Sequence, residues 1–152
     1  MAITINGLIA KPNDDTSFTS QEDHVGFKKI CLENKAVIVG QRTYDLLQND
    51  PEFNYPECTY FVLRHDGPTA KEILTIIEEK GFKSACIIGG GKTNTAFLKD
   101  GLINEIYLDI EPYVFGQGIP LFATADFEYK LELLEVKNLS PQTLQLHYRV
   151  QK

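Results

Sequence analysis

Ala85-Cys86-Ile87-Ile88-Gly89-Gly90-Gly91-Lys92-Thr93 is the stretch that decides the fold. Its apolar start predicts a strand over Ala85–Ile88 that is covered on both faces, and a helix follows over Thr93–Lys99. Glycines let the backbone approach a ligand closely, and a helix start directs free N–H groups at an anion. We therefore predict a phosphate-binding turn at Gly89, Gly90, Gly91, Lys92 and Thr93; a tight turn without a ligand is the alternative.

Neither of two familiar phosphate loops fits this turn. The P-loop pattern needs a glycine at position 86, where the chain has Cys86. The dinucleotide fingerprint Gly-x-Gly-x-x-Gly, started at Gly89, needs a glycine at position 94, where the chain has Asn94. The prediction of a phosphate-binding turn therefore rests on the glycines and the helix start, and not on a known sequence motif.

A second apolar strand, Ala36–Val39, ends in a similar way. It is followed by Gly40-Gln41-Arg42-Thr43, a glycine and then a helix start that carries a cation and a hydroxyl. Two such turns on neighbouring strands would hold both ends of a pyrophosphate-linked dinucleotide. A third strand, Thr59–Leu63, ends at Arg64, and a cation there could bind a phosphate on the adenosine ribose, which favours NADPH over NADH. For both arginines the alternative is a solvated surface cation.

Strands and helices alternate along the rest of the chain. We predict a strand over Ile3–Ile9, a helix begun by a capping box at Thr19 and Glu22, and a second capped helix from Thr69 that ends at Gly81. The remaining predicted elements are a short helix over Thr43–Leu47, a strand over Glu105–Ile110, and a hairpin of Tyr129–Val136 with Thr143–Val150.

This pattern predicts an α/β fold in one domain, residues 1–152. The expected architecture has three layers, with a mostly parallel twisted sheet flanked by helices and a C-terminal antiparallel hairpin. Ligands of such sheets bind beyond the carboxyl ends of the strands. Those ends are Ala10, Gly40, Leu63 with Arg64, Gly89 and Glu111.

Composition excludes several classes of function. The 152 residues carry a net charge of −6, which argues against a nucleic-acid or membrane surface and leaves a small-molecule substrate. The three cysteines and three histidines show no metal-ligand spacing, so we predict no metal site. We find no signal peptide and no apolar run of about 20 residues, and therefore expect a cytoplasmic protein.

Asp23 is the candidate catalytic carboxylate. It lies four residues before Phe27, so both side chains share one helix face, and a buried acid there could bind a heterocycle and help to deliver a proton. An acid favoured by the helix dipole is the alternative. The loop Glu111–Pro120 contains Tyr113 and other aromatic side chains that could cover a flat ring, or simply pack as a connection.

Several segments together resemble one known family. They are Ile87–Gly91, Phe97-Leu98, Gly101–Ile106, Pro112–Phe122 and Val37–Tyr44. In order and spacing they are similar to the reductase domain of bifunctional riboflavin-biosynthesis deaminase/reductases, within the dihydrofolate-reductase-like superfamily.

The resemblance implies an NADPH-dependent reductase that forms a homodimer. It assigns the cofactor phosphates to Gly40–Thr43, Arg64 and Gly89–Thr93, and it implies a cis peptide at Gly89–Gly90. On the substrate side it implies Asn6, Asp23, Phe27 and Asp109.

Three departures keep alternatives open. The chain has no tryptophan, whereas folate enzymes usually carry a Pro-Trp pair after the first strand. Asn6 stands where riboflavin-type reductases usually have aspartate, and no zinc-deaminase motif is present. Reduction of 5-amino-6-(5-phosphoribosylamino)uracil is the first expectation. A dihydrofolate reductase and a non-catalytic nucleotide-binding domain are the alternatives.

Overall fold

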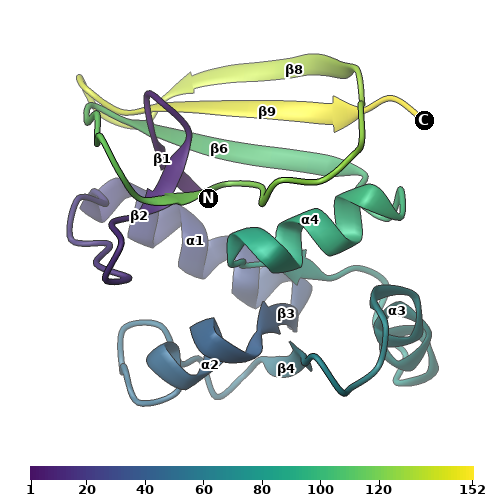
Figure 1. Ribbon diagram of the computed structural model, residues 1–152. Coiled ribbons are helices and arrows are strands. Elements are labelled where there is room, and N and C mark those ends of the chain that lie inside the picture. Colours follow the sequence, from purple (N-terminus) through teal and green to yellow (C-terminus); the bar gives the residue numbers. More distant parts are fainter.

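A computed structural model describes residues 1–152 (Figure 1). The helices are α1 (Gln21–Asn34), α2 (Gln41–Leu47), α3 (Ala70–Glu79) and α4 (Gly91–Lys99). The strands are β1 (Ala2–Thr4), β2 (Leu8–Ala10), β3 (Ala36–Gly40), β4 (Thr59–Leu63), β5 (Cys86–Ile87), β6 (Glu105–Glu111), β7 (Ile119–Pro120), β8 (Leu131–Asn138) and β9 (Leu144–Val150). None of the helices combines the length and the apolar character that crossing a lipid bilayer requires.

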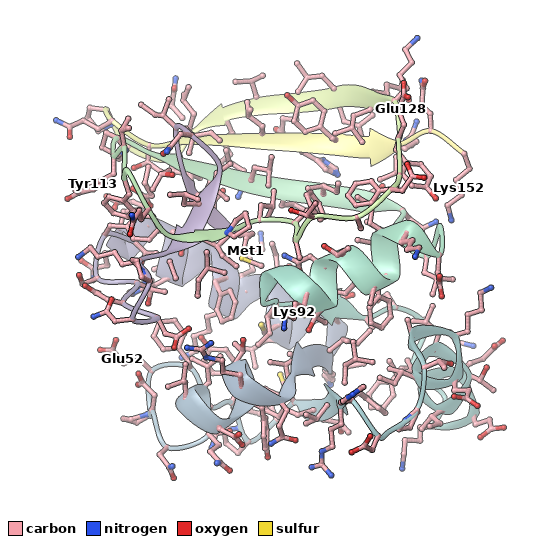
Figure 2. All side chains as sticks on the ribbon, viewed as in Figure 1. Met1, Glu52, Lys92, Tyr113, Glu128 and Lys152 are labelled. Carbon is pink, nitrogen blue, oxygen red and sulfur yellow. The ribbon has the colours of Figure 1, made fainter.

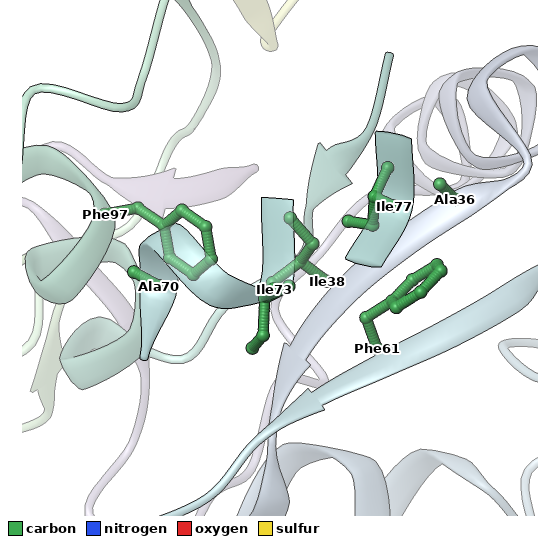
Figure 3. Packing of buried hydrophobic residues seen from close by; sticks show 7 residues of the cluster. All are labelled: Ala36, Ile38, Phe61, Ala70, Ile73, Ile77 and Phe97. Carbon is green, nitrogen blue, oxygen red and sulfur yellow. The ribbon is translucent and has the colours of Figure 1, made fainter. Parts of the chain in front are cut away.

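Strand β3 is the centre of the core because both of its faces are covered. Alternate side chains of a strand point to opposite faces. On one face, Ile38 packs with Ile77 of α3 and Phe97 of α4 (Figure 3). On the other face, Val37 packs with Cys31 of α1. Helices on both sides of the strands give the three layers that the sequence predicts.

The strand pairing agrees with the predicted fold class in its main features. Strand β3 lies between β4 and β5 and is parallel to both, and β1 is parallel to β6. The C-terminal strands β8 and β9 form the expected antiparallel hairpin, and β9 joins it to β6. No strand pairing connects β5 to β1, so the order β4-β3-β5 stands apart from β1-β6-β9-β8.

The predicted strand Ile3–Ile9 is wrong as one element. It is divided into β1 and β2 by a turn in which the Gly7 N–H donates to the Thr4 carbonyl at 2.9 Å. Gly7 has φ +81°, a backbone conformation that favours glycine. The Leu8 N–H also donates to the Thr4 hydroxyl, so the carbonyl and the side chain of Thr4 together close the turn.

The two predicted capping boxes have different outcomes. The box at Thr69 is confirmed: its hydroxyl accepts from the Glu72 N–H, and the Glu72 carboxylate accepts from the Thr69 N–H. The box at Thr19 is wrong, because α1 is capped by Ser20, whose hydroxyl accepts from the Asp23 N–H. The shift by one residue places Asp23 at the third position of the helix, facing the interior.

Candidate functional site

The two glycine-ended turns lie against each other. The Gly40 N–H donates to the Gly89 carbonyl at 2.8 Å. A Cβ atom on Gly40 would lie 2.5 Å from the Thr93 hydroxyl oxygen, and one on Gly90 would lie 3.3 Å from the Thr43 hydroxyl oxygen. The peptide bond between Gly89 and Gly90 is cis, as the family resemblance implied. The two turns are therefore adjacent, as the dinucleotide site predicted from the sequence needs them to be.

The start of α4 offers backbone donors beside this junction. Gly90 is the N-cap, and no side chain caps the helix. The N–H groups of Gly91, Lys92 and Thr93 have no acceptor among the hydrogen bonds of the protein. Lys92 is exposed in this first turn (Figure 2) and adds a positive charge. The combination suits an anion.

The cations of the neighbouring strands are already engaged by polar partners. Leu63 lies opposite Gly40 in the sheet, so Arg64 and Gln41 follow side by side, and the Arg64 guanidinium donates to the Gln41 side-chain oxygen at 2.6 Å. Arg42 forms an ion pair with Asp14, although its own side chain is mostly exposed. Sequence reasoning missed Asp14, which reaches Arg42 from the loop before α1.

Asp23 is buried near two other acids, Asp109 and Glu111. Its side chain is 5% exposed, and its Oδ1 has no hydrogen-bond partner. Burial, a hydrogen bond with the Asp109 carboxyl, and the charges of Asp109 and Glu111 raise the pKa of Asp23 to about 8. The positive chain terminus at Met1 opposes this shift. A carboxyl of this kind keeps its proton at neutral pH and can donate it.

Glu111 has a larger role in this cluster than the sequence indicated. Its side chain is 1% exposed; one oxygen accepts from the N–H and hydroxyl of Ser20, and the other accepts from the Thr143 hydroxyl. Asp109 accepts from the Gln145 amide at 2.8 Å. The available signal was the spacing, since Asp109 and Glu111 are two residues apart on β6 and therefore share a face.

Asn6 and Tyr113 lie at an aromatic loop. The Asn6 amide donates to the Phe115 carbonyl at 2.7 Å, and its oxygen accepts from the Thr4 hydroxyl. Tyr113, which is labelled in Figure 2, is 46% exposed, and its ring packs edge-on against Phe18. The predicted polar group Asn6 is thus used to hold this loop in place.

The segment 112–123 joins the aromatic loop to the glycine junction. Its strand β7 pairs with β2, and a Cβ on Gly118 would lie 2.4 Å from the Ala10 carbonyl oxygen. Further on, the Asn94 amide donates to the Leu121 carbonyl at 2.9 Å. A Cβ on Gly91 would lie 2.4 Å from the Pro120 oxygen, so this backbone runs directly past the start of α4.

Phe27 is the predicted site residue that is least clearly part of this arrangement. Its ring packs against those of Phe53 and Tyr55, with centroids 5.7 and 6.3 Å away. Phe27 and Asp109 both line a cavity of about 710 Å³ between α1 and β6. Phe27 therefore shares a cavity wall with Asp109 but contributes mainly to packing.

Known proteins with similar sequences or structures point to one family. The family model described as the RibD C-terminal domain matches residues 54–145. The Bacillus subtilis protein YwjB is 29% identical, over 97% of this chain and 94% of that protein. A second Bacillus subtilis protein, YyaP, is 21% identical, over 97% of this chain and 91% of its own length. Both of these relatives are described as uncharacterized.

Solved structures share the fold. A riboflavin biosynthesis protein from Shewanella sp. PV-4 aligns with a TM-score of 0.85 at 21% identity, over all of this chain and 97% of that one. A deaminase/reductase from Thermotoga maritima aligns at 0.75 and 16% identity, over 98% of this chain and 54% of that one. Since the family model covers more than half of its residues, this chain belongs to the RibD C-terminal domain family and has the dihydrofolate-reductase-like fold predicted from its sequence.

Proposed function

We propose that the chain is an NADPH-dependent reductase that transfers hydride to a small ribosylated heterocycle, of the 5-amino-6-(5-phosphoribosylamino)uracil type. The observation that carries the proposal is the contact of the two glycine-ended turns beside an uncapped α4. Membership of the RibD C-terminal domain family supports the reaction class.

The residues present fit a diphosphate. Gly89, Gly90 and Gly91 leave no side chain on the backbone that runs into α4, and three successive N–H groups there have no acceptor. Lys92 would add charge at this end, and Arg42 and Arg64 would contact the phosphates farther along the cofactor. When bound, NADPH supplies the hydride from its nicotinamide ring.

On the substrate side, Asp23 would hold and deliver a proton. Because the pKa of Asp23 is raised to about 8, its carboxyl carries a proton at neutral pH. Its unpartnered Oδ1 can bind a ring N–H or amino group of a heterocycle, which would satisfy a buried polar atom. Asp109 would keep that proton in place through its hydrogen bond to Asp23, while Asn6 and Tyr113 would border the ring.

Fluorescence titration of NADPH tests the cofactor site. Lys92→Gln should weaken NADPH binding by about tenfold, the loss of one charge-assisted contact. Lys99→Gln is the matched control, since it removes the same charge from the other end of α4. If both variants bind as the unaltered chain does, or if the chain binds no nicotinamide cofactor, the proposed site is wrong.

A second candidate is reduction of dihydrofolate. It is favoured by one observation, the buried Asp23 carboxyl, because such a group can pair with the amino and ring nitrogens of a pterin. Oxidation of NADPH, followed at 340 nm with each substrate in turn, separates the two candidates. Binding of NADPH without oxidation by either substrate would favour a non-catalytic nucleotide-binding domain.

A homodimer through the C-terminal hairpin remains part of the proposal. Strand β8 pairs only with β9, and its side chains Leu131, Leu133 and Val136 are 38%, 51% and 54% exposed. An open apolar edge strand of this kind is suited to association. Leu133→Glu should convert a dimer to a monomer in sedimentation velocity, and Glu132→Gln should not; a monomeric unaltered chain would contradict the expectation.

A further inference from the structure

Two buried thiols face each other between α1 and β5. The Sγ atoms of Cys31 on α1 and Cys86 on β5 lie 3.9 Å apart, and both cysteines are free. Cys31 is 1% exposed and is the most buried residue of its helix, more so than Asp23. The helix therefore turns a sulfur toward β5 at its most buried point.

The surroundings of the two sulfurs are apolar and hold them weakly. Cys31 and Cys86 belong to one hydrophobic cluster with Val37 and Val39. The hydrogen bonds of the Cys86 thiol join it to the Cys31 sulfur and, at 3.8 Å, to the Ala36 carbonyl. Hydrogen bonds of thiols are weak, so no strong interaction has to break for the two sulfurs to come closer.

The third cysteine lies near this pair but is held differently. Cys58 is half-buried just before β4, and its thiol donates to the Cys31 backbone carbonyl at 3.4 Å. No hydrogen bond joins Cys58 to either of the other sulfurs. The fold thus brings together one specific pair out of the three thiols.

The two paired thiols differ in acidity. The hydrogen bond with Cys31 lowers the pKa of Cys86, whereas that bond and burial raise the pKa of Cys31. The thiolate is the form of cysteine that attacks an oxidant. Cys86 is also the more exposed of the two, and it lines the cavity of about 710 Å³. Cys86 is therefore suited to react first, with Cys31 in place to react second.

We propose that Cys31 and Cys86 form a reversible disulfide when the folded protein meets hydrogen peroxide. The Cys86 thiolate attacks one peroxide oxygen, and the O–O bond breaks to leave a sulfenic acid and a hydroxide that takes up a proton. The Cys31 thiol then attacks the Cys86 sulfur. The S–O bond breaks, and the hydroxyl leaves with the Cys31 proton as water, so two electrons pass from the sulfurs to the peroxide.

The disulfide would join two elements that carry different parts of the site. Helix α1 also carries Asp23, and β5 leads into the turn at Gly89. A covalent bond would restrain the helix against the strand until a dithiol reduces it by exchange. Disulfides that form in reducing compartments are usually transient and serve to sense oxidants. The inference depends on the geometry of the thiols and is independent of the proposed reaction.

Peptide mapping of the unaltered, folded chain tests the proposal. Treatment with hydrogen peroxide should lower the number of free thiols from three to one. The mass should fall by about 2 Da, the two hydrogens that a disulfide loses. Digestion without reduction should yield one linked pair of peptides, which contain Cys31 and Cys86. Dithiothreitol should restore all three thiols.

The same oxidation in urea provides the reference for the unfolded chain. Cys31 is 27 residues from Cys58 and 55 residues from Cys86. Closure of the shorter loop is favoured by about threefold, so the unfolded chain should link Cys58 more often than it joins Cys31 to Cys86. The folded chain should reverse this preference.

Two variants complete the test. Cys58→Ala is the matched control and should form the disulfide in the same yield, because Cys58 bonds to neither sulfur. Cys86→Ala should form none. The proposal would be overturned by a link to Cys58 in the folded chain, by links between separate chains, or by oxidation of Cys86 without a link. It would also be overturned if the folded chain kept three thiols under conditions that oxidise the unfolded one.

Discussion

The Asp23 carboxyl on α1 hydrogen-bonds the Asp109 carboxyl on β6, and both side chains are buried. Two carboxyls can form such a bond only when one of them carries a proton. Asp109 is further fixed by the Gln145 amide, which donates to it at 2.8 Å. The proton is therefore held on the Asp23 side of the pair.

Replacing the partner should release part of the pKa shift. In Asp109→Asn, the pKa of Asp23 should fall below about 8, because one hydrogen bond and one negative charge are removed. It should stay above 3.8, because burial, the largest cause, persists. Carbon-13 NMR of the side-chain carboxyl measures this directly, with Asp126→Asn as an exposed control. An unchanged pKa would show that Asp109 does not contribute.

The stability of the protein should fall as pH rises through the neutral range. The folded pKa of Asp23 is about 8 and its ordinary value is 3.8, so between these values the folded state binds more protons than the unfolded one. The contribution of Asp23 to the free energy of unfolding is complete below about pH 4 and is lost by about pH 8. Between these values the free energy of unfolding falls by at most about 1.4 kcal/mol per pH unit. Urea unfolding at pH 5 and pH 8 should show this fall. Asp23→Asn should lack it.

The glycine junction should reject a methyl group at Gly40. Its Cβ would lie 2.5 Å from the Thr93 hydroxyl oxygen, so Gly40→Ala should cost about 1–3 kcal/mol of stability. Adding Thr93→Ala should recover part of that loss, since the clashing atom is removed. Gly26→Ala in α1 is the control, because a Cβ there has no neighbour within 4 Å. Additive losses in the double variant would contradict the close approach.

Arg64 should discriminate between the two nicotinamide cofactors. If its guanidinium binds the 2′-phosphate, Arg64→Ala should weaken NADPH by about tenfold and leave NADH nearly unchanged. Gln41→Ala is a companion variant, because it keeps the Arg64 charge but removes the side-chain oxygen that accepts a hydrogen bond from Arg64. Fluorescence titration with each cofactor measures the ratio. Equal losses for NADPH and NADH would remove Arg64 from this role.

Asp14 should compete with the cofactor for Arg42. The two side chains form an ion pair, so Asp14→Asn should free the guanidinium and tighten NADPH several-fold. Asparagine also tolerates the positive φ of 63° at this position. Asp15→Asn is the matched control, since Asp15 pairs with Lys11 instead. Weaker binding in Asp14→Asn would argue against a phosphate contact at Arg42.

Elements set by local patterns could be predicted closely from the sequence. The strand Thr59–Leu63 has the bounds expected of it, and the capping box at Thr69 begins α3 as expected. Helix starts were less well placed: α2 begins at Gln41 and α4 at Gly91, each two residues before its predicted start. At α4 the missed turn contains Gly91, and glycine is a poor helix former when read alone; at α2 the missed residues follow the N-cap Gly40.

Features that depend on distant residues could not be read from local patterns. Ser20 rather than Thr19 caps α1, and Ser20 is held by Glu111, far away in sequence. Asn6 is fixed by Phe115 in the same way. Asp23 was singled out from its helix face, whereas Asp109 was assigned to the same side of the site only through the family resemblance. The roles proposed for these site residues stay predictions.

The segment 112–123 connects the two halves of the proposed site. At one end the Ile5 N–H donates to the Tyr113 carbonyl, and at the other the Ala123 N–H donates to the Gly91 carbonyl. One short tether thus spans from the region proposed for the heterocycle to the start of α4. If a ligand that shifts one end of the segment also shifts the other, binding at one half should change the affinity at the other, and by the same factor in both directions. Calorimetry of each ligand with and without the other measures this factor.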